Sequence, residues 1–125
     1  MIEYRVKVDN CGNKYWYLND ERHREDGPAI EWANGNKEWF LNGKLHRENG
    51  PACEYADGSK YWFLNGKRHR GDGPAVEWVH GTKEWYLNGI KLSEQEFLRK
   101  TSPELQVIED LRKVAERYGY KLIKT

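Results

Sequence analysis

Apolar and polar positions alternate over most of the first 92 residues. In residues 1–8 the apolar side chains of Ile2, Tyr4, Val6 and Val8 alternate with charged ones, which is the pattern of a strand with one buried face. The alternation returns in residues 14–19, 37–42, 60–65 and 83–88. In each of these segments a tryptophan and a leucine share one face. Each segment is therefore predicted to be a strand.

The alternating segments recur at a fixed interval. Trp16, Trp39, Trp62 and Trp85 follow one another every 23 residues. Two further motifs keep the same register, namely His23-Arg24, His46-Arg47 and His69-Arg70, and Gly27-Pro28-Ala29, Gly50-Pro51-Ala52 and Gly73-Pro74-Ala75. A period of this length indicates an architecture of stacked repeats.

Each repeat is predicted to contain a second strand and two kinds of connection. The second strands follow proline, in residues 28–32, 51–55 and 74–78, since proline is tolerated at the first position of a strand. Asn34-Gly35 and its equivalents are predicted to be two-residue type I′ turns, because both residues tolerate positive φ. The longer connections carry the His-Arg pairs and should line the opposite edge of the sheet. Whether their Lys-x-His segments pair as a third short strand is left open by the sequence.

The predicted fold is mainly β, a single-layer antiparallel β-meander of stacked 23-residue hairpin repeats over residues 1–92. With two strands per repeat, each repeat should advance about 10 Å along the sheet. The four periodic tryptophans would then form an apolar row, and core packing is their expected role.

Residues 93–125 are predicted to be a C-terminal α-helical cap, packed on the sheet rather than independent. Ser93 and Glu96 form a capping box for a short helix, and Pro103 suits the first turn of a second one. Leu105, Ile108, Leu111, Val114, Ala115 and Tyr118 make the apolar stripe of that second helix. Residues 120–123 are predicted to form a final strand. The cap is expected to cover the open edge of the sheet, and the alternative is a separate helix that binds a partner.

Charge and cysteine content narrow the environment of the protein. Charged residues make up 33% of the chain and the net charge is +1. Residues 1–92 carry 14 basic and 14 acidic residues, and the tail carries 7 and 6, so neither part has the excess that steers a protein to nucleic acid or anionic lipid. The two cysteines are predicted to lie too far apart for a disulfide. A cytoplasmic protein without a transmembrane segment is expected.

The repeat resembles the MORN repeat. The matching residues are Asn42-Gly43-Lys44-Leu45-His46, Asn65-Gly66-Lys67-Arg68-His69 and Ala56-Asp57-Gly58. Arg47 and Arg70 stand where the MORN consensus has glycine, and Gly-Pro-Ala follows, as in a variant MORN group of antitoxin-like and phage-encoded small proteins. The resemblance covers about residues 10–92. It implies a binding or scaffolding module that brings no catalytic residues with it.

The His-Arg pairs are the first candidates for chemistry: His23, Arg24, His46, Arg47, His69 and Arg70. Zinc ligands converge on one ion about 2 Å away, whereas histidines in separate repeats lie ~10 Å apart, so no metal and no cofactor are expected. The arginines could line up as a phosphate-binding strip. We favour local ion pairs with neighbouring acids, chiefly Asp26 and Asp72, that hold each loop in shape.

The second candidate surface is the aromatic face that carries Tyr17, Phe40, Tyr61 and Phe63. A single-layer sheet leaves part of this face exposed, and an exposed aromatic strip is typical of protein-binding surfaces. We expect a non-catalytic protein-interaction module, an inhibitor or antitoxin-like phage or mobile-element protein that blocks a bacterial protein through the His-Arg loops and this face. The alternatives are binding of nucleic acid or phospholipid headgroups through the loop arginines, and an enzyme that uses His46 or His69.

Overall fold

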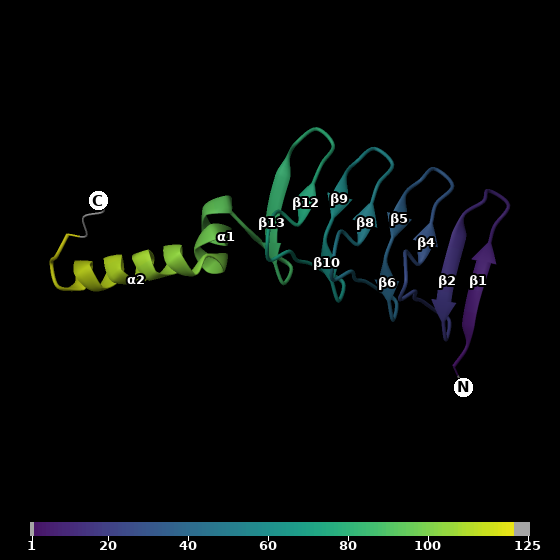
Figure 1. Cartoon of the computed structure of the whole chain (residues 1–125), viewed down its shortest axis with the longest axis horizontal. Coiled ribbons are helices and arrows are strands. Elements are labelled where there is room, and N and C mark those ends of the chain that lie inside the picture. The colour runs from purple at the N-terminus through teal and green to yellow at the C-terminus, as the bar shows by residue number, and fades with distance from the viewer. Residues whose placement is uncertain (1, 122–125) are drawn as a thin grey trace.

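The computed structural model describes residues 2–121 and confirms the predicted fold class. Antiparallel hairpins stand side by side in a row from β1 to β13, and two helices follow the last hairpin (Figure 1). Within these residues the main sheet has ten strands. Nine of them lie in the spatial order β1 (Tyr4–Val8), β2 (Lys14–Leu18), β4 (Ile30–Glu31), β5 (Lys37–Glu38), β8 (Cys53–Glu54), β9 (Lys60–Tyr61), β12 (Val76–Glu77), β13 (Lys83–Leu87) and β14 (Ile90–Leu92). This order follows the chain, so the sheet is a meander.

A third short strand is present in each repeat, which answers the question that the sequence left open. These strands are β3 (Glu21–Arg22), which pairs with β2, β7 (Lys44–Leu45), which pairs with β6 (Phe40–Leu41), and β11 (Lys67–Arg68), which pairs with β10 (Phe63–Leu64). The predicted strands 37–42 and 60–65 are therefore each divided in two at a tryptophan. The Trp39 N–H donates to the Ala52 carbonyl at 2.7 Å, and the Trp39 carbonyl accepts from the His46 N–H at 3.0 Å. The backbone of the tryptophan thus links both halves of the repeat.

The positions of the type I′ turns differ from the prediction. Gly35 has a φ of +96° but Asn34 is not in the left-handed region, and the Gly35 N–H donates to the Trp32 carbonyl at 2.9 Å. This is a three-residue loop in which only the glycine takes positive φ. The pair with positive φ at both centres is Asn42-Gly43, at 49° and 77°, which joins β6 to β7. Asn42-Gly43 forms a hairpin turn because β7 pairs with β6. The sequence did not settle whether β7 forms, so it could not assign the type I′ turn to Asn42-Gly43.

The His-Arg loops cross the middle of the sheet and do not lie at its edge. His23 donates its backbone N–H to the carbonyl of Trp16, and Trp16 donates to Ala29. Both ends of the loop are therefore beside the central residue of β2. The Asn-Gly hairpins occupy the edge instead, because the third strand carries the chain back from the edge before the loop begins.

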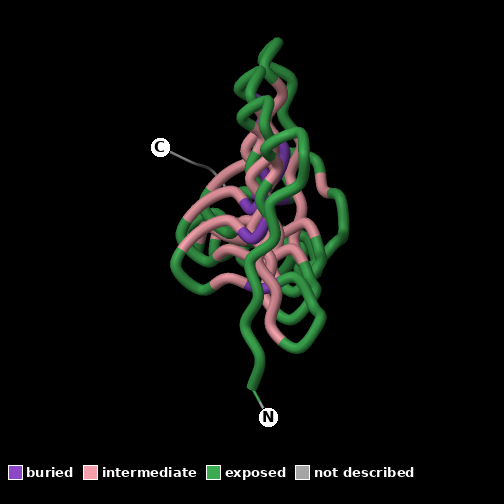
Figure 2. The backbone as a smooth tube through the Cα atoms, turned by 90° about the vertical axis from the view of Figure 1, so that its right-hand side faces the viewer, coloured by how far each residue is buried: buried purple, intermediate pink, exposed green. Residues whose placement is uncertain are grey.

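Small and β-branched side chains, together with Cys53, form the buried centre of the repeats. Ala29, Ala52 and Ala75 have exposed fractions of 0%, and Ile30, Cys53 and Val76 follow them at no more than 3%. Figure 2 shows the buried segments in the middle of the cross-section, with exposed backbone around them. The periodic tryptophans, which were expected in the core, are only half-buried. The core is formed instead by the alanine of each Gly-Pro-Ala motif and the residue after it, while Trp16, Trp39 and Trp62 each lie under an arginine side chain.

The two helices differ in how they contact the sheet. In α1 (Glu94–Thr101) Ser93 caps the first turn, accepting from the Glu96 N–H at 3.1 Å, as predicted. Phe97 is buried, and α1 packs against β13 and β14. The longer α2 (Pro103–Arg117) contacts α1 and projects beyond the sheet (Figure 1), and none of its residues is buried. Helix α1 therefore covers the end of the sheet, and α2 packs on α1.

The end of the chain lies largely outside the described residues. Residues 120 and 121 have no regular structure, and residues 122–123 of the predicted final strand lie beyond the described part. Between residues 2 and 121 no helix has both the length and the apolar composition to cross a membrane.

Candidate functional site

The three predicted histidines connect successive repeats. Nδ1 of His23 accepts a hydrogen bond from the backbone N–H of Asn42 at 3.0 Å, and His46 and His69 accept in the same way from Asn65 and Asn88 at 2.9 Å. His23 is 6% exposed. Each imidazole therefore satisfies the backbone at the start of the next hairpin turn. The geometry assigns these residues to the connection between repeats.

The three loop arginines are held by their own repeats. The guanidinium carbons of Arg24, Arg47 and Arg70 stand 4.0, 3.9 and 4.0 Å from the ring centroids of Trp16, Trp39 and Trp62. This is the arrangement of a cation–π contact. The same side chains bond the carbonyls of Pro28, Pro51 and Pro74 at 3.1–3.2 Å. Every arginine thus stacks on a tryptophan and closes its loop.

The ion pairs of these arginines include both predicted and unpredicted partners. Arg24 bonds Asp26 and Arg70 bonds Asp72, each at 2.9 Å, as expected for local pairs. Arg47 has Asn49 at the equivalent position and pairs with Glu54 at 2.9 Å. Glu31 and Glu77 occupy the matching place for the other two arginines, at 3.5 and 3.3 Å. The second-strand glutamates were missed because the paired residues lie seven apart in the chain.

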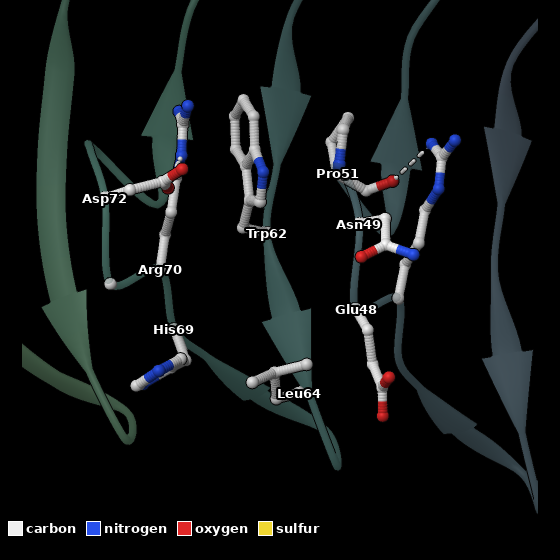
Figure 3. Close-up of a pocket in the computed structure, with 11 residues that line it drawn as sticks. Glu48, Asn49, Pro51, Trp62, Leu64, His69, Arg70 and Asp72 are labelled. Carbon is white, nitrogen blue, oxygen red and sulfur yellow. Dashed lines mark hydrogen bonds and ion pairs between the residues drawn. The ribbon is translucent and has the colours of Figure 1, made fainter.

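Three grooves lie beside the periodic tryptophans. One groove, with a volume of about 690 Å³, has Trp62, Leu64 and His69 on one side and Glu48, Asn49 and Pro51 on the other (Figure 3). The next, of about 630 Å³, repeats this set at Trp39 and shares the wall 47–49 with the first. The third, of about 520 Å³, lies at Trp16 against β1, which carries no loop. The His-Arg loops therefore divide one face of the sheet, which we call the grooved face, into two similar compartments at Trp39 and Trp62 and a differently walled one at Trp16.

The rims of these grooves expose carboxylates. The side chains of Glu25, Asp26, Glu48 and Asp72 are 75–86% exposed, whereas the loop arginines are 22–29% exposed. The hydrogen bond from Arg24 and its positive charge lower the pKa of Asp26, so this carboxylate stays ionised in mildly acidic solution. This face is therefore acidic at its rim, although the sequence suggested a row of arginines.

The predicted aromatic face is partly covered by cationic side chains. Tyr17, Phe40, Tyr61 and Phe63 are all half-buried. Lys7 lies over the ring of Tyr17, Arg22 over Phe40 and Arg68 over Tyr61, at 5.3–5.7 Å. Tyr61 also accepts a hydrogen bond from Nε1 of Trp78 at 3.1 Å. Of these four aromatic residues, only Tyr17 lines one of the three grooves.

No cluster of side chains in the described part of the chain could bind a metal ion. Residues 2–121 contain no group of three or more His, Cys, Asp or Glu side chains placed to hold a metal ion. Comparison of the chain with family models, with curated proteins and with solved structures finds no match. The function must therefore be argued from the grooved face itself.

Proposed function

We propose that this chain is a non-catalytic protein-interaction module that binds a partner along its grooved face. The observation that supports this most is a groove beside a half-exposed tryptophan that is built alike at Trp39 and Trp62, with a further groove at Trp16 on the same face. Tryptophan is among the residue types that are enriched where binding energy concentrates in protein interfaces. Repeated compartments suit an extended segment of a partner better than one small molecule.

The biological role that fits this surface is that of a variant MORN-type inhibitor. As an antitoxin-like protein from a phage or mobile element, the chain would occupy a bacterial protein and block it. The motif of Asn-Gly turns followed by His-Arg pairs supports this role through the resemblance. The exposed apolar stripe of α2 offers a second contact area, since Val107, Leu111 and Val114 are 52–57% exposed.

Binding of nucleic acid or lipid headgroups receives less support from the geometry. Arg24, Arg47 and Arg70 would carry it, but each already stacks on a tryptophan and bonds carboxylates. The exposed charges beside them are negative and would repel phosphate.

Filling the grooves without disturbing the fold tests the proposal. Gly71 lines a groove, and a Cβ at this position would meet nothing within 4 Å. Asn49 is exposed and lines two grooves. We expect the double variant Asn49→Trp, Gly71→Trp to fold and to lose proteins that the unchanged chain captures from bacterial lysate, as measured by quantitative mass spectrometry.

The matched control is Val79→Trp, at an exposed turn away from the grooves. It should retain those proteins. Identical captured sets for all three chains would show that the grooved face does not bind the partner.

A further inference from the structure

The grooves at Trp39 and Trp62 are open slots built in the same way, whereas the groove at Trp16 lies against β1 and has no proline in its lining. Trp62 lies between Arg70, which stacks on it at 4.0 Å, and Pro51 of the preceding loop (Figure 3). One face of the indole is therefore taken, and the other faces a proline across the groove. Trp39 and Pro28 repeat the arrangement in the adjacent groove. The indole and the proline ring both present apolar surface to the groove, so an apolar ring of a ligand can pack against them.

The distance between successive slots selects one backbone conformation. The main sheet contains two strands per repeat, such as β5 and β8, so successive slots are about 9.6 Å apart. A polyproline II helix has three residues per turn and rises about 3.1 Å per residue, which places every third side chain on one face about 9.3 Å apart. Same-face residues of an α-helix recur at about 5.4 Å after one turn and about 10.5 Å after two, and same-face residues of a strand recur at about 6.8 Å, so both fit the spacing of about 9.6 Å less closely. Among regular backbones, polyproline II matches the slots.

The slots also present a donor that such a backbone can use. Among the described residues, the indole N–H groups of Trp16, Trp39 and Trp62 have no protein acceptor, in contrast to that of Trp78. No buried side-chain nitrogen or oxygen there lacks a partner, so these three N–H groups reach solvent. The carbonyls of a polyproline II helix are free of internal hydrogen bonds and can accept from them.

The charge of the loops around the grooves indicates which other residues a bound segment should carry. Glu25, Glu48 and Asp72 project from the loops with exposed carboxylates. Complementary charge favours lysine or arginine in a bound segment. An acidic segment would meet like charge along its whole length.

We propose that the grooved face binds a basic polyproline II segment of a partner protein, with proline at every third position seated in successive Trp slots. This inference rests on the proposed function and names the class of segment that the partner presents. The segment lies along the row of repeats, crosses the groove at Trp16 and seats its prolines in the slots of Trp39 and Trp62.

The test uses acetylated peptides and the full chain. The first peptide has four Pro-Lys-Ala units, the second has the same residues reordered so that neighbouring prolines no longer share a face, and the third replaces lysine by glutamate. We expect the first to bind by calorimetry and the other two to bind about tenfold more weakly or not at all. The ¹⁵N–¹H resonances of the indoles of Trp16, Trp39 and Trp62 should shift on binding, while that of Trp78 stays in place.

Variants separate this inference from the proposed function. Asn49→Trp, Gly71→Trp should weaken the first peptide about tenfold, and Val79→Trp should leave it unchanged. Equal affinity for the ordered and reordered peptides, or preference for the glutamate peptide, would overturn the inference. If no peptide binds while the filled variant still loses a captured protein, the inference fails and the proposed function stands. If the filled variant loses nothing either, both fail.

Discussion

At the scale of single residues, the histidines and arginines of the His-Arg pairs make contacts that hold the repeats together. Each histidine of the His-Arg pairs accepts a backbone hydrogen bond from the next repeat, and each arginine stacks on a tryptophan. The second ring nitrogen, Nε2, lies 3.4 Å from Glu25 in His23 and 3.6 Å from Glu48 in His46. The His-Arg pair recurs because each repeat uses the histidine to bond the next repeat and the arginine to cover its own tryptophan.

The role of His46 as a connector predicts a loss of stability on substitution. His46→Ala removes the acceptor that the exposed Asn65 N–H has at 2.9 Å, and should lower the free energy of unfolding by about 0.5–1.5 kcal/mol, since water can take the place of the acceptor. His46→Asn offers an amide oxygen near the same place and should recover part of the loss. Urea denaturation measures both, and equal stability of all three proteins would remove the connecting role.

The buried thiol of Cys53 should make the protein less stable at alkaline pH. Burial, and then the charge of Glu38, raise the pKa of the Cys53 thiol to about 12, against about 8.5 in an unfolded chain. Above the unfolded value the unfolded chain releases this proton while the native chain keeps it, so stability should fall as pH rises toward 12. Denaturation at neutral pH and near pH 10 should show this fall in the unchanged protein. Cys53→Val, which matches Ile30 and Val76 in register, should show a smaller one.

The same burial predicts selective thiol labelling. Cys11 is exposed and Cys53 is buried, and both are free thiols. Under native conditions a thiol reagent should modify Cys11 alone, and Cys53 should react only after denaturant is added. Rapid labelling of a Cys11→Ser variant would contradict the packing around Cys53.

At the scale of elements, the two helices have different functions in the fold. Helix α1 closes the last hairpin with the buried side chain of Phe97, whereas α2 buries no residue. Most of the apolar stripe predicted for α2 is present but faces solvent. The stripe is then available to another surface, and the sheet does not depend on it.

This difference predicts opposite outcomes for two changes. Phe97→Ala should destabilise the protein by about 3–5 kcal/mol, because a fully packed aromatic ring is lost. Ending the chain at Ser102 should leave the thermal unfolding temperature of the sheet nearly unchanged. Leu98→Ala is the control within α1, as Leu98 is 42% exposed. A large loss of stability on truncation would show that α2 supports the sheet.

At the scale of the whole molecule, stability is built from contacts between neighbouring repeats. His23 and Asn13 bond Asn42 and Ala33 of the next unit, and the same bonds recur from Asn36 to Ala56 and from Ser59 to Val79. Proteins of this kind behave as linear arrays in which each unit contacts only its neighbours. The length of the array should therefore be adjustable.

Removal of one unit tests this linear arrangement. Deleting residues 37–59 joins Asn36 to Lys60 and keeps the 23-residue register. We expect a folded, shorter sheet with a lower free energy of unfolding and a smaller dependence on denaturant, since less surface is buried. Circular dichroism and urea titration would measure this. A deletion of 37–54, which breaks the register, is the control and should not fold cooperatively.

Much of the architecture could be read from local patterns. Alternation identified the strands, the 23-residue period showed their stacking, and Ser93 and Pro103 marked the starts of both helices. The division of the strands at Trp39 and Trp62 could not be read, because it depends on hydrogen bonds to residues 7 and 13 positions away, His46 and Ala52 for Trp39. The grooves were missed for the same reason, since their walls come from successive repeats.

The chain by itself determined the repeat, its register and its antiparallel sheet, because these follow from side-chain periodicity within a few residues. Only the tertiary structure decided that the histidines bond the neighbouring repeat, that the arginines cover tryptophans, and that α2 stands without a partner on the sheet. Those contacts depend on how neighbouring repeats are placed relative to each other in three dimensions. A sequence pattern that recurs in every repeat does not specify that placement.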